Sequence, residues 1–168
     1  MSRPLDPRRC NVAIDANAIY RNGSSHDRLV DRLLELASAG TIQLMVPKGV
    51  RAEILNPRTP SHIRKAVLPQ IFSMPVALNS DEERRHRIIE QELTGNARPG
   101  KHSADADHLF EAAKYGGYFI THDERVLKRA GRLRDVLPPS LTVTTLLDFV
   151  VIFDQYVAQD TEDSSATR

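Results

Sequence analysis

Four short apolar runs, each followed by a segment with helical spacing, constrain the fold of this 168-residue chain more than any other feature. Short uninterrupted apolar runs are typical of parallel strands that are buried on both faces. Strands that alternate with helices predict an α/β domain, because the helices form the crossovers of a parallel sheet. The sequence therefore predicts three α/β/α layers around a mostly parallel central sheet of four or five strands. The runs are NVAIDA from residue 11, IQLMVP from residue 42, YFIT from residue 118 and LTVTTL from residue 141.

Helices are predicted where apolar residues recur at helical spacing and turn-forming residues close the pattern. Pro47 suits the first turn of one of these helices, whereas Pro69 kinks or ends another. Ser80 and Glu83 match a capping box, and Ser103 is placed to cap the helix that follows it. The predicted helices span 26–39, 47–56, 61–72, 80–93, 103–114, 123–131 and 146–157.

The composition is that of one soluble globular domain, with 40% hydrophobic and 27% charged residues. A single cysteine, Cys10, excludes an internal disulfide, which is typical of proteins from a reducing compartment. Neither a secretory signal nor an apolar run long enough to cross a bilayer is visible, so we expect a cytoplasmic protein without membrane contact. We expect an N-terminal extension over 1–10, the domain over 11–158 and a disordered polar tail over 159–168.

Acidic side chains follow the predicted strands at the points where these strands end. Asp15 ends the first strand, Asp123 follows the third, and Glu53 lies in the helix after the second. Asp105 and Asp107 lie in the first turn of the helix over 103–114. Ligands of open parallel sheets bind at the carboxyl ends of the strands, so we expect these acids to share one edge of the sheet.

A cluster of carboxylates at one edge predicts a site for a divalent cation. Neighbouring carboxylates repel each other and raise each other's pKa, and a hard cation removes this repulsion. Mg²⁺ and Mn²⁺ prefer carboxylate oxygen and water, without a need for Cys or His. One or two such ions can activate a water molecule and stabilise charge on a phosphodiester. Asn17 and Thr121 are placed to orient the ligands or the attacking water.

The ordered set of motifs resembles the PIN domain, the nuclease fold of VapC-type toxins and related ribonucleases. The resemblance covers most of the chain, roughly residues 12–150, and it implies a Mg²⁺- or Mn²⁺-dependent endoribonuclease. The matching motifs are IDAN from residue 14, GVRAEIL from residue 49, DADHLFEAAKYG from residue 105 and YFITHD ending at residue 123.

The resemblance also implies roles for single residues. It implies that Asn17 and Thr121 support the metal-binding acids. Asp107 departs from the commonest pattern of the family, because it adds an acid beside Asp105 and leaves the identity of the third acid open by two positions. Asp105 is preferred for its helical offsets. The catalytic, metal-binding acids would be Asp15, Glu53, Asp105 and Asp123.

The resemblance implies that the substrate is RNA and that the protein acts as the toxin of a toxin-antitoxin pair. The partner would then be a small antitoxin protein that blocks the acidic crevice. A homodimer is also implied, and the apolar closing helix with Phe149 and Phe153 supplies either its surface or core. A stand-alone RNA-processing protein and a non-catalytic interaction module of the same fold are the alternatives. An aspartyl-phosphate enzyme fits less well, because it has a second Asp where this chain has Asn17.

Each acid also has a simpler interpretation. Asp15 and Asp123 are good helix N-caps, and Glu53 is a good helix former that is normally solvated. Asp107 suits the first turn of a helix because of the helix dipole. If Asp15 is a metal ligand, its replacement by Asn removes a repelling charge, so we expect it to raise the stability of the metal-free protein.

Basic and histidine residues flank the proposed acids. Arg125, Lys128 and Arg129 follow Asp123 closely, and they either contact RNA phosphates or form a solvated face. The net charge of +1 alone says little about partners. Without the acidic tail from residue 160, the chain has 22 basic and 19 acidic residues, a mildly basic balance that is compatible with RNA binding without requiring it. We expect His108 and His122 to lie behind the ligands or at the surface, since hard cations seldom need imidazole.

Overall fold

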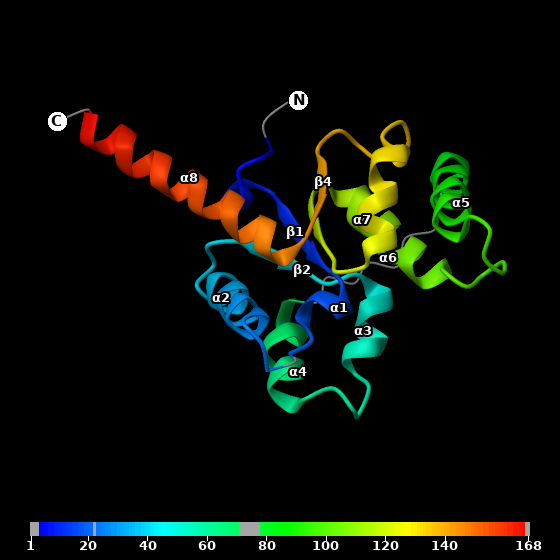
Figure 1. Cartoon of the computed structure of the whole chain (residues 1–168), viewed down its shortest axis with the longest axis horizontal. Coiled ribbons are helices and arrows are strands. Elements are labelled where there is room, and N and C mark those ends of the chain that lie inside the picture. Colours follow the sequence, from blue (N-terminus) through cyan, green and yellow to red (C-terminus); the bar gives the residue numbers. More distant parts are fainter. Residues whose placement is uncertain (1–3, 22, 71–77, 167–168) are drawn as a thin grey trace.

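A four-stranded sheet organises the computed structural model, which describes residues 4–21, 23–70 and 78–166. The strands span Asn11–Ile14 (β1), Gln43–Met45 (β2), Gly117–Ile120 (β3) and Leu141–Thr144 (β4). Their order is β2-β1-β3-β4, and all three neighbouring pairs are parallel (Figure 1). The predicted α/β fold with three layers and a parallel central sheet is confirmed.

Helices connect the strands, and each helix predicted from the sequence is present within the described residues. A one-turn helix after β1 was not predicted, because four residues are too few to show a helical period. The helix predicted over 61–72 gives way at residue 68 to a 3-10 turn that contains Pro69, and residues 71–72 lie outside the described residues. The helices span Ala16–Ile19 (α1), His26–Ser38 (α2), Lys48–Ile54 (α3), Ser61–Val67 (α4), Ser80–Thr94 (α5), Ser103–Tyr115 (α6), Glu124–Ala130 (α7) and Leu146–Ala166 (α8).

The two central strands divide the core into two halves, because successive side chains of a strand point to opposite faces. Val12 and Ile14 of β1 pack in one half with residues of α1, α2, α3, α4 and α8. Ala13 of β1 and Phe119 of β3 pack in the other half with residues of α5, α6 and α7. Phe149 of α8 is fully buried, so the first half of the closing helix supplies core.

Two predicted helix caps differ in register from the observed ones. The capping box of α5 joins Asn79 and Glu82, one residue before the predicted pair of Ser80 and Glu83. An asparagine caps as well as a serine, and Glu82 lies three residues after it, as the box requires. Ser103 is the first helical residue of α6 and donates to the carbonyl oxygen of residue 100 instead of capping the helix.

The last helix is in contact with the N-terminal segment. α8 continues as a helix to Ala166, whereas the sequence predicts a disordered tail from residue 159. Arg8 pairs with Asp160, and the Tyr156 hydroxyl donates to the carbonyl oxygen of Pro4, so residues of the N-terminal extension hold this part of α8. Within the described residues, no helix is long and apolar enough to cross a membrane.

Candidate functional site

Asp15 follows β1 directly and is buried, with 5% of the residue exposed. Its Oδ2 accepts hydrogen bonds from Asn17 Nδ2 at 2.8 Å and from Thr121 Oγ1 at 2.9 Å. Its Oδ1 accepts a hydrogen bond from the backbone amide of Ala16 at 2.8 Å, so Asp15 is also the N-cap of α1. Asn17 and Thr121 therefore act first on the carboxylate of Asp15, and the predicted cap is present.

These hydrogen bonds reverse the expected effect of neutralising Asp15. An asparagine in its place would turn an amide group toward three hydrogen-bond donors that now share two carboxylate oxygens. Hydrogen bonds to a charged acceptor are also stronger than those to a neutral one. We therefore expect Asp15→Asn to lower the stability of the metal-free protein, contrary to the expectation from charge repulsion alone.

Asp15 has one unfilled position, on its Oδ1 oxygen. A carboxylate offers about four lone-pair positions, two on each oxygen, and both positions on Oδ2 are used. His108 Nδ1 faces this position at 3.3 Å from Oδ1, which is close enough for an ion pair when the ring is protonated but lacks the geometry of a full hydrogen bond. Burial of the ring acts to lower the pKa of His108, but Asp15 and the neighbouring acids raise it above its ordinary value. Because only 2% of His108 is exposed, this nitrogen is a buried polar atom whose hydrogen bonding is incomplete. Such atoms are rare in folded proteins and call for an explanation, of which a missing ligand is one.

The contact between α3 and α6 determines where Glu53 lies. Glu111 of α6 accepts a hydrogen bond from the backbone amide of Lys48, the first residue of α3. Glu111 thereby accepts from one of the N-terminal amides of α3 that have no hydrogen-bond partner within the helix. Gly49 lies against the ring of His108. Glu53 comes one helical turn after Gly49, on the same side of α3, and therefore also faces α6.

Neither contact between α3 and α6 was predicted from the sequence. The available signal is the spacing of Asp105, His108 and Glu111, which are three residues apart and hence lie on one side of α6. That spacing predicts a shared helix face but does not say which helix packs against it.

The carboxyl group of Glu53 lies near enough to those of Asp15 and Asp105 for their charges to change its pKa. The pKa of Glu53 is raised above its ordinary value, first by the partial burial of its carboxyl group. The nearby His108 lowers it, and the negative charges of Asp15 and Asp105 raise it further. Glu53 is exposed as a whole residue, so the loss of water on one side is enough to produce this direction.

Asp105 and Asp107 point to different neighbours. Asp105 lies 3.0 Å from His102 Nδ1 and acts electrostatically on both Glu53 and His108. Asp107 is exposed and contacts His86 of α5, with 2.6 Å between its Oδ1 and Nε2 of that ring. The arrangement favours Asp105 over Asp107 as the acid that faces Asp15.

Asp123 is joined to Asp15 through Thr121. Its backbone amide donates to Thr121 Oγ1 at 3.1 Å, and the same hydroxyl donates to Asp15. Its carboxylate accepts from the amides of Arg125 and Val126, so Asp123 is the N-cap of α7, as predicted. A second carboxylate oxygen remains for other ligands, and the cap leaves a metal-binding role open.

His122 and His108 differ in burial. His122 is exposed, and its ring contacts that of His26 edge to face at 4.7 Å between ring centroids. Partial burial and the neighbouring His26 lower the pKa of His122. His108 instead lies directly behind Asp15 and between α3 and α6.

The donor set suits a hard cation, although the side chains do not form a ready-made cage. Among the described residues, no group of three His, Cys, Asp or Glu side chains is arranged to hold a metal ion. The acids at this edge nevertheless supply the oxygen ligands that Mg²⁺ and Mn²⁺ prefer. The unfilled position on Asp15 and the raised pKa of Glu53 are both features that a cation would relieve. The residues therefore fit such an ion by their chemistry.

The basic residues that follow Asp123 bind largely to the protein itself. Arg125 donates to the carbonyl oxygen of Leu93 at 3.4 Å, and Arg129 donates to that of Glu92. Both carbonyls belong to the last turn of α5, whose carbonyls lack partners within the helix. Lys128 pairs with Glu124 on the exposed side of α7 at 2.6 Å. The two arginines therefore connect α7 to α5. Their positions do not favour the predicted contact with RNA phosphates.

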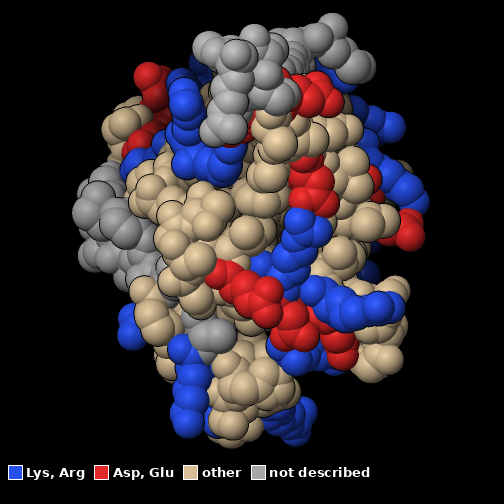
Figure 2. All heavy atoms as spheres, turned by 90° about the vertical axis from the view of Figure 1, so that its left-hand side faces the viewer, with Lys and Arg blue, Asp and Glu red and all other residues tan. Residues whose placement is uncertain are grey.

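The face on which α2 and α8 lie carries both signs of charge. Figure 2 shows basic and acidic side chains interleaved on this side of the molecule, without a broad area of either sign. The interleaving reflects ion pairs such as Arg32 with Asp154 and Arg21 with Asp31. A face of mixed charge offers little general attraction to a polyanion.

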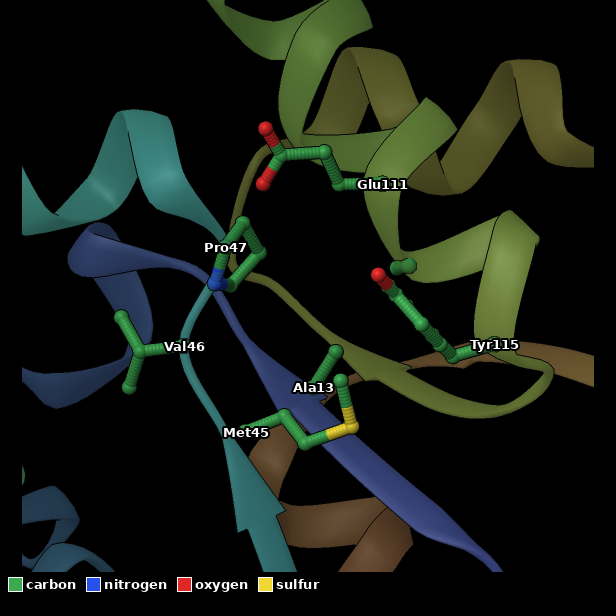
Figure 3. A pocket seen from close by; sticks show the side chains of 7 residues that line it. Ala13, Met45, Val46, Pro47, Glu111 and Tyr115 are labelled. Atoms are coloured by element: carbon green, nitrogen blue, oxygen red, sulfur yellow. The ribbon is translucent and has the colours of Figure 1, made fainter. Parts of the chain in front are cut away.

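A small pocket lies between the carboxyl end of β2 and α6. Met45 and Pro47 line one side, and Glu111 and Tyr115 line the other (Figure 3). Its volume of about 20 Å³ is enough for one water molecule but not for a nucleotide. The candidate site is therefore not this pocket but the acidic edge, the edge of the sheet that carries Asp15, Glu53, Asp105 and Asp123.

Comparison of the chain with protein-family models, with curated proteins and with solved structures found no significant match. The resemblance to PIN domains thus depends on the motifs of the sequence.

Proposed function

We propose that this protein is a divalent-metal-dependent ribonuclease that hydrolyses RNA phosphodiester bonds. The observation that carries the proposal is the Asp15 carboxylate, which three hydrogen bonds hold in place while one position stays unfilled near Glu53, His108 and Asp105. A buried carboxylate of this kind at the carboxyl edge of a parallel sheet is where such folds bind ligands.

Asp15, Glu53 and Asp105 would hold Mg²⁺ or Mn²⁺, with Asp123 one hydroxyl away through Thr121. The ion, when bound, would activate a water molecule and stabilise negative charge on the phosphodiester. The protein contributes orientation, because the hydrogen bonds from Asn17 and Thr121 hold the carboxylate of Asp15 in one direction. The packing of α3 on α6 keeps Glu53 beside it.

Hydrolysis by water is supported over attack by Asp15 itself. Both lone-pair positions on Oδ2 are used, and Oδ1 also accepts the amide of Ala16. A nucleophilic carboxylate needs a free oxygen, and its activity falls as hydrogen bonds stabilise the charge. The position two residues after Asp15 is Asn17, which donates to the carboxylate instead of supplying a second acid.

A role as the toxin of a toxin-antitoxin pair is part of the same proposal, and it rests on the resemblance to VapC-type PIN domains. An antitoxin would cover the acidic edge and inhibit cleavage. A stand-alone RNA-processing nuclease would have no such partner. The gene next to that of this protein separates the two, since a short neighbouring gene for a DNA-binding protein supports the toxin.

The test is cleavage of total RNA by the purified protein with Mn²⁺ or Mg²⁺, followed by mapping of the cut ends. Asp15→Asn should abolish cleavage, and EDTA should do the same to the wild type. Asp135→Asn, which changes an exposed acid between α7 and β4, is the matched control and should cleave normally. Equal cleavage by Asp15→Asn, or cleavage that persists in EDTA, would contradict the proposal.

A further inference from the structure

His108 is the buried polar group for which the proposed chemistry has no role. The residue is 2% exposed, and its Nδ1 lies 3.3 Å from Asp15 Oδ1, an ion-pair contact that lacks the geometry of a full hydrogen bond. A buried imidazole nitrogen whose hydrogen bonding is incomplete is unfavourable. Its position beside a carboxylate with an unfilled lone pair indicates that the two groups serve a common ligand.

Gly49 is what allows the ring to lie there. A Cβ atom at this position would lie 2.6 Å from His108 Nε2 and 2.8 Å from its Cδ2. Both distances are too short for non-bonded contact, so any larger residue would displace the ring or move α3 away from α6. The ring is therefore held between the backbone of α3 on one side and Asp15 on the other.

The charges of Asp15, Glu53 and Asp105 all act on the His108 ring. These are the three acids that would bind the cation, and they come from three different elements of the fold: the end of β1, α3 and α6. His108 belongs to α6 and contacts both of the other elements, the end of β1 at Asp15 and α3 at Gly49. Its ring thus connects α6 with the end of β1 and with α3, the elements on which the other two acids lie.

We propose that His108 is a positioning residue of the metal site, which spaces Glu53 and Asp105 about Asp15 Oδ1 through its Nδ1 and its packing on Gly49. The inference depends on the proposed metal site, and it goes further by assigning a role to two residues outside the acidic set. Partners that orient metal ligands typically change metal affinity by about 10- to 100-fold when they are replaced.

Two substitutions of His108 separate positioning from simple packing. His108→Leu keeps a side chain of similar size but has no nitrogen, whereas His108→Asn is smaller and can place an amide nitrogen near the position of Nδ1. We expect His108→Leu to remain folded and to bind Mn²⁺ about 10- to 100-fold more weakly in calorimetry. His108→Asn should bind Mn²⁺ within a few-fold of the wild type but should have a lower Tm.

Gly49→Ala tests the contact from the other side. In the wild-type background it should weaken Mn²⁺ binding, because the added Cβ displaces the ring. In the His108→Asn background, where a smaller side chain faces residue 49, the same change should have much less effect. Such non-additivity is expected for two residues in direct contact.

The outcomes separate this inference from the proposed function. Wild-type affinity in His108→Leu, or an equal loss of affinity in His108→Leu and His108→Asn, would overturn the positioning role while leaving the metal site intact. Failure of the wild type itself to bind Mn²⁺ would overturn both. If His108→Leu does not fold, His108→Asn and Gly49→Ala still test the inference through the additivity of their effects.

Discussion

The two sides of the Asp15 carboxylate differ in how completely their polar groups are satisfied. On the side of β3, Asn17 and Thr121 both donate to Oδ2, and Asn17 in turn accepts the backbone amide of His122 at 2.8 Å. On the side of α3 and α6, the charges of Asp15 and Asp105 both act against the ionised form of Glu53. The contact of His108 Nδ1 with Asp15 on this side lacks the geometry of a full hydrogen bond.

This difference indicates that the two sides of the carboxylate have different roles in the proposed site. The satisfied side is a scaffold that would have the same geometry with or without a ligand, because each donor there already has its acceptor. The unsatisfied side holds the electrostatic repulsion that a cation would remove. The cation of the proposed site would therefore enter on the side of α3 and α6.

The largest effect should come from removing a charge on the unsatisfied side. Asp105→Asn should weaken Mn²⁺ binding by more than about 100-fold, beyond the range for partners that do not touch the metal. Asp107→Asn should change it little, since Asp107 is exposed and contacts His86 of α5. Calorimetric titration of both variants measures this, and the reverse order would assign the third ligand to Asp107.

A loss of stability should follow from damage to the satisfied side. Thr121→Val keeps the shape of a fully buried residue but removes a donor to Asp15 and the acceptor of the Asp123 amide. We expect this change to lower the free energy of unfolding by about 1–3 kcal/mol. Thr142→Val in β4 is the control, because Thr142 lies in a strand but away from the acidic edge. Urea denaturation that finds the two variants equally stable would show that the hydroxyl of Thr121 has no structural role.

The smallest effect should be a gain of stability on the unsatisfied side. The folded protein raises the pKa of Glu53, so it binds the proton of this group more tightly than the unfolded chain does. Stability therefore falls as pH rises through the ordinary pKa of about 4.5, and it levels off above the raised pKa. Glu53→Gln should remove this fall and raise metal-free stability near pH 7 by no more than about 0.5 kcal/mol.

Unfolding by urea at a series of pH values without metal measures the effect of Glu53→Gln. The variant and the wild type should have equal stability at low pH, where Glu53 is protonated, and should diverge as pH rises. A variant that is less stable than the wild type at neutral pH would mean that Glu53 is paired favourably in the metal-free protein.

The sequence predicts the sheet well because its signals are local. Short apolar runs such as VAI in β1 and YFI in β3 indicate buried strands without knowledge of their neighbours. The acids at strand ends could be predicted for the same reason, since topology alone brings the carboxyl ends of parallel strands to one edge.

The contacts that shape the candidate site could not be predicted, because they join segments far apart in the chain. Glu111 binds the amide of Lys48 across 63 residues, and the room for His108 depends on a glycine in another helix. Arg129 resembles a phosphate-binding residue in sequence, yet in the structure it donates to a carbonyl of α5. Each of these depends on tertiary packing, which residue types and spacing do not contain.

Calorimetric titration of Mn²⁺ into the metal-free wild type, Asp15→Asn and Asp135→Asn tests the central claim most directly. The account predicts saturable binding to the wild type and to Asp135→Asn, and binding weaker by more than about 100-fold in Asp15→Asn. Circular dichroism should show that Asp15→Asn remains folded. Equal binding by the wild type and a folded Asp15→Asn variant, or no binding by the wild type, would contradict it.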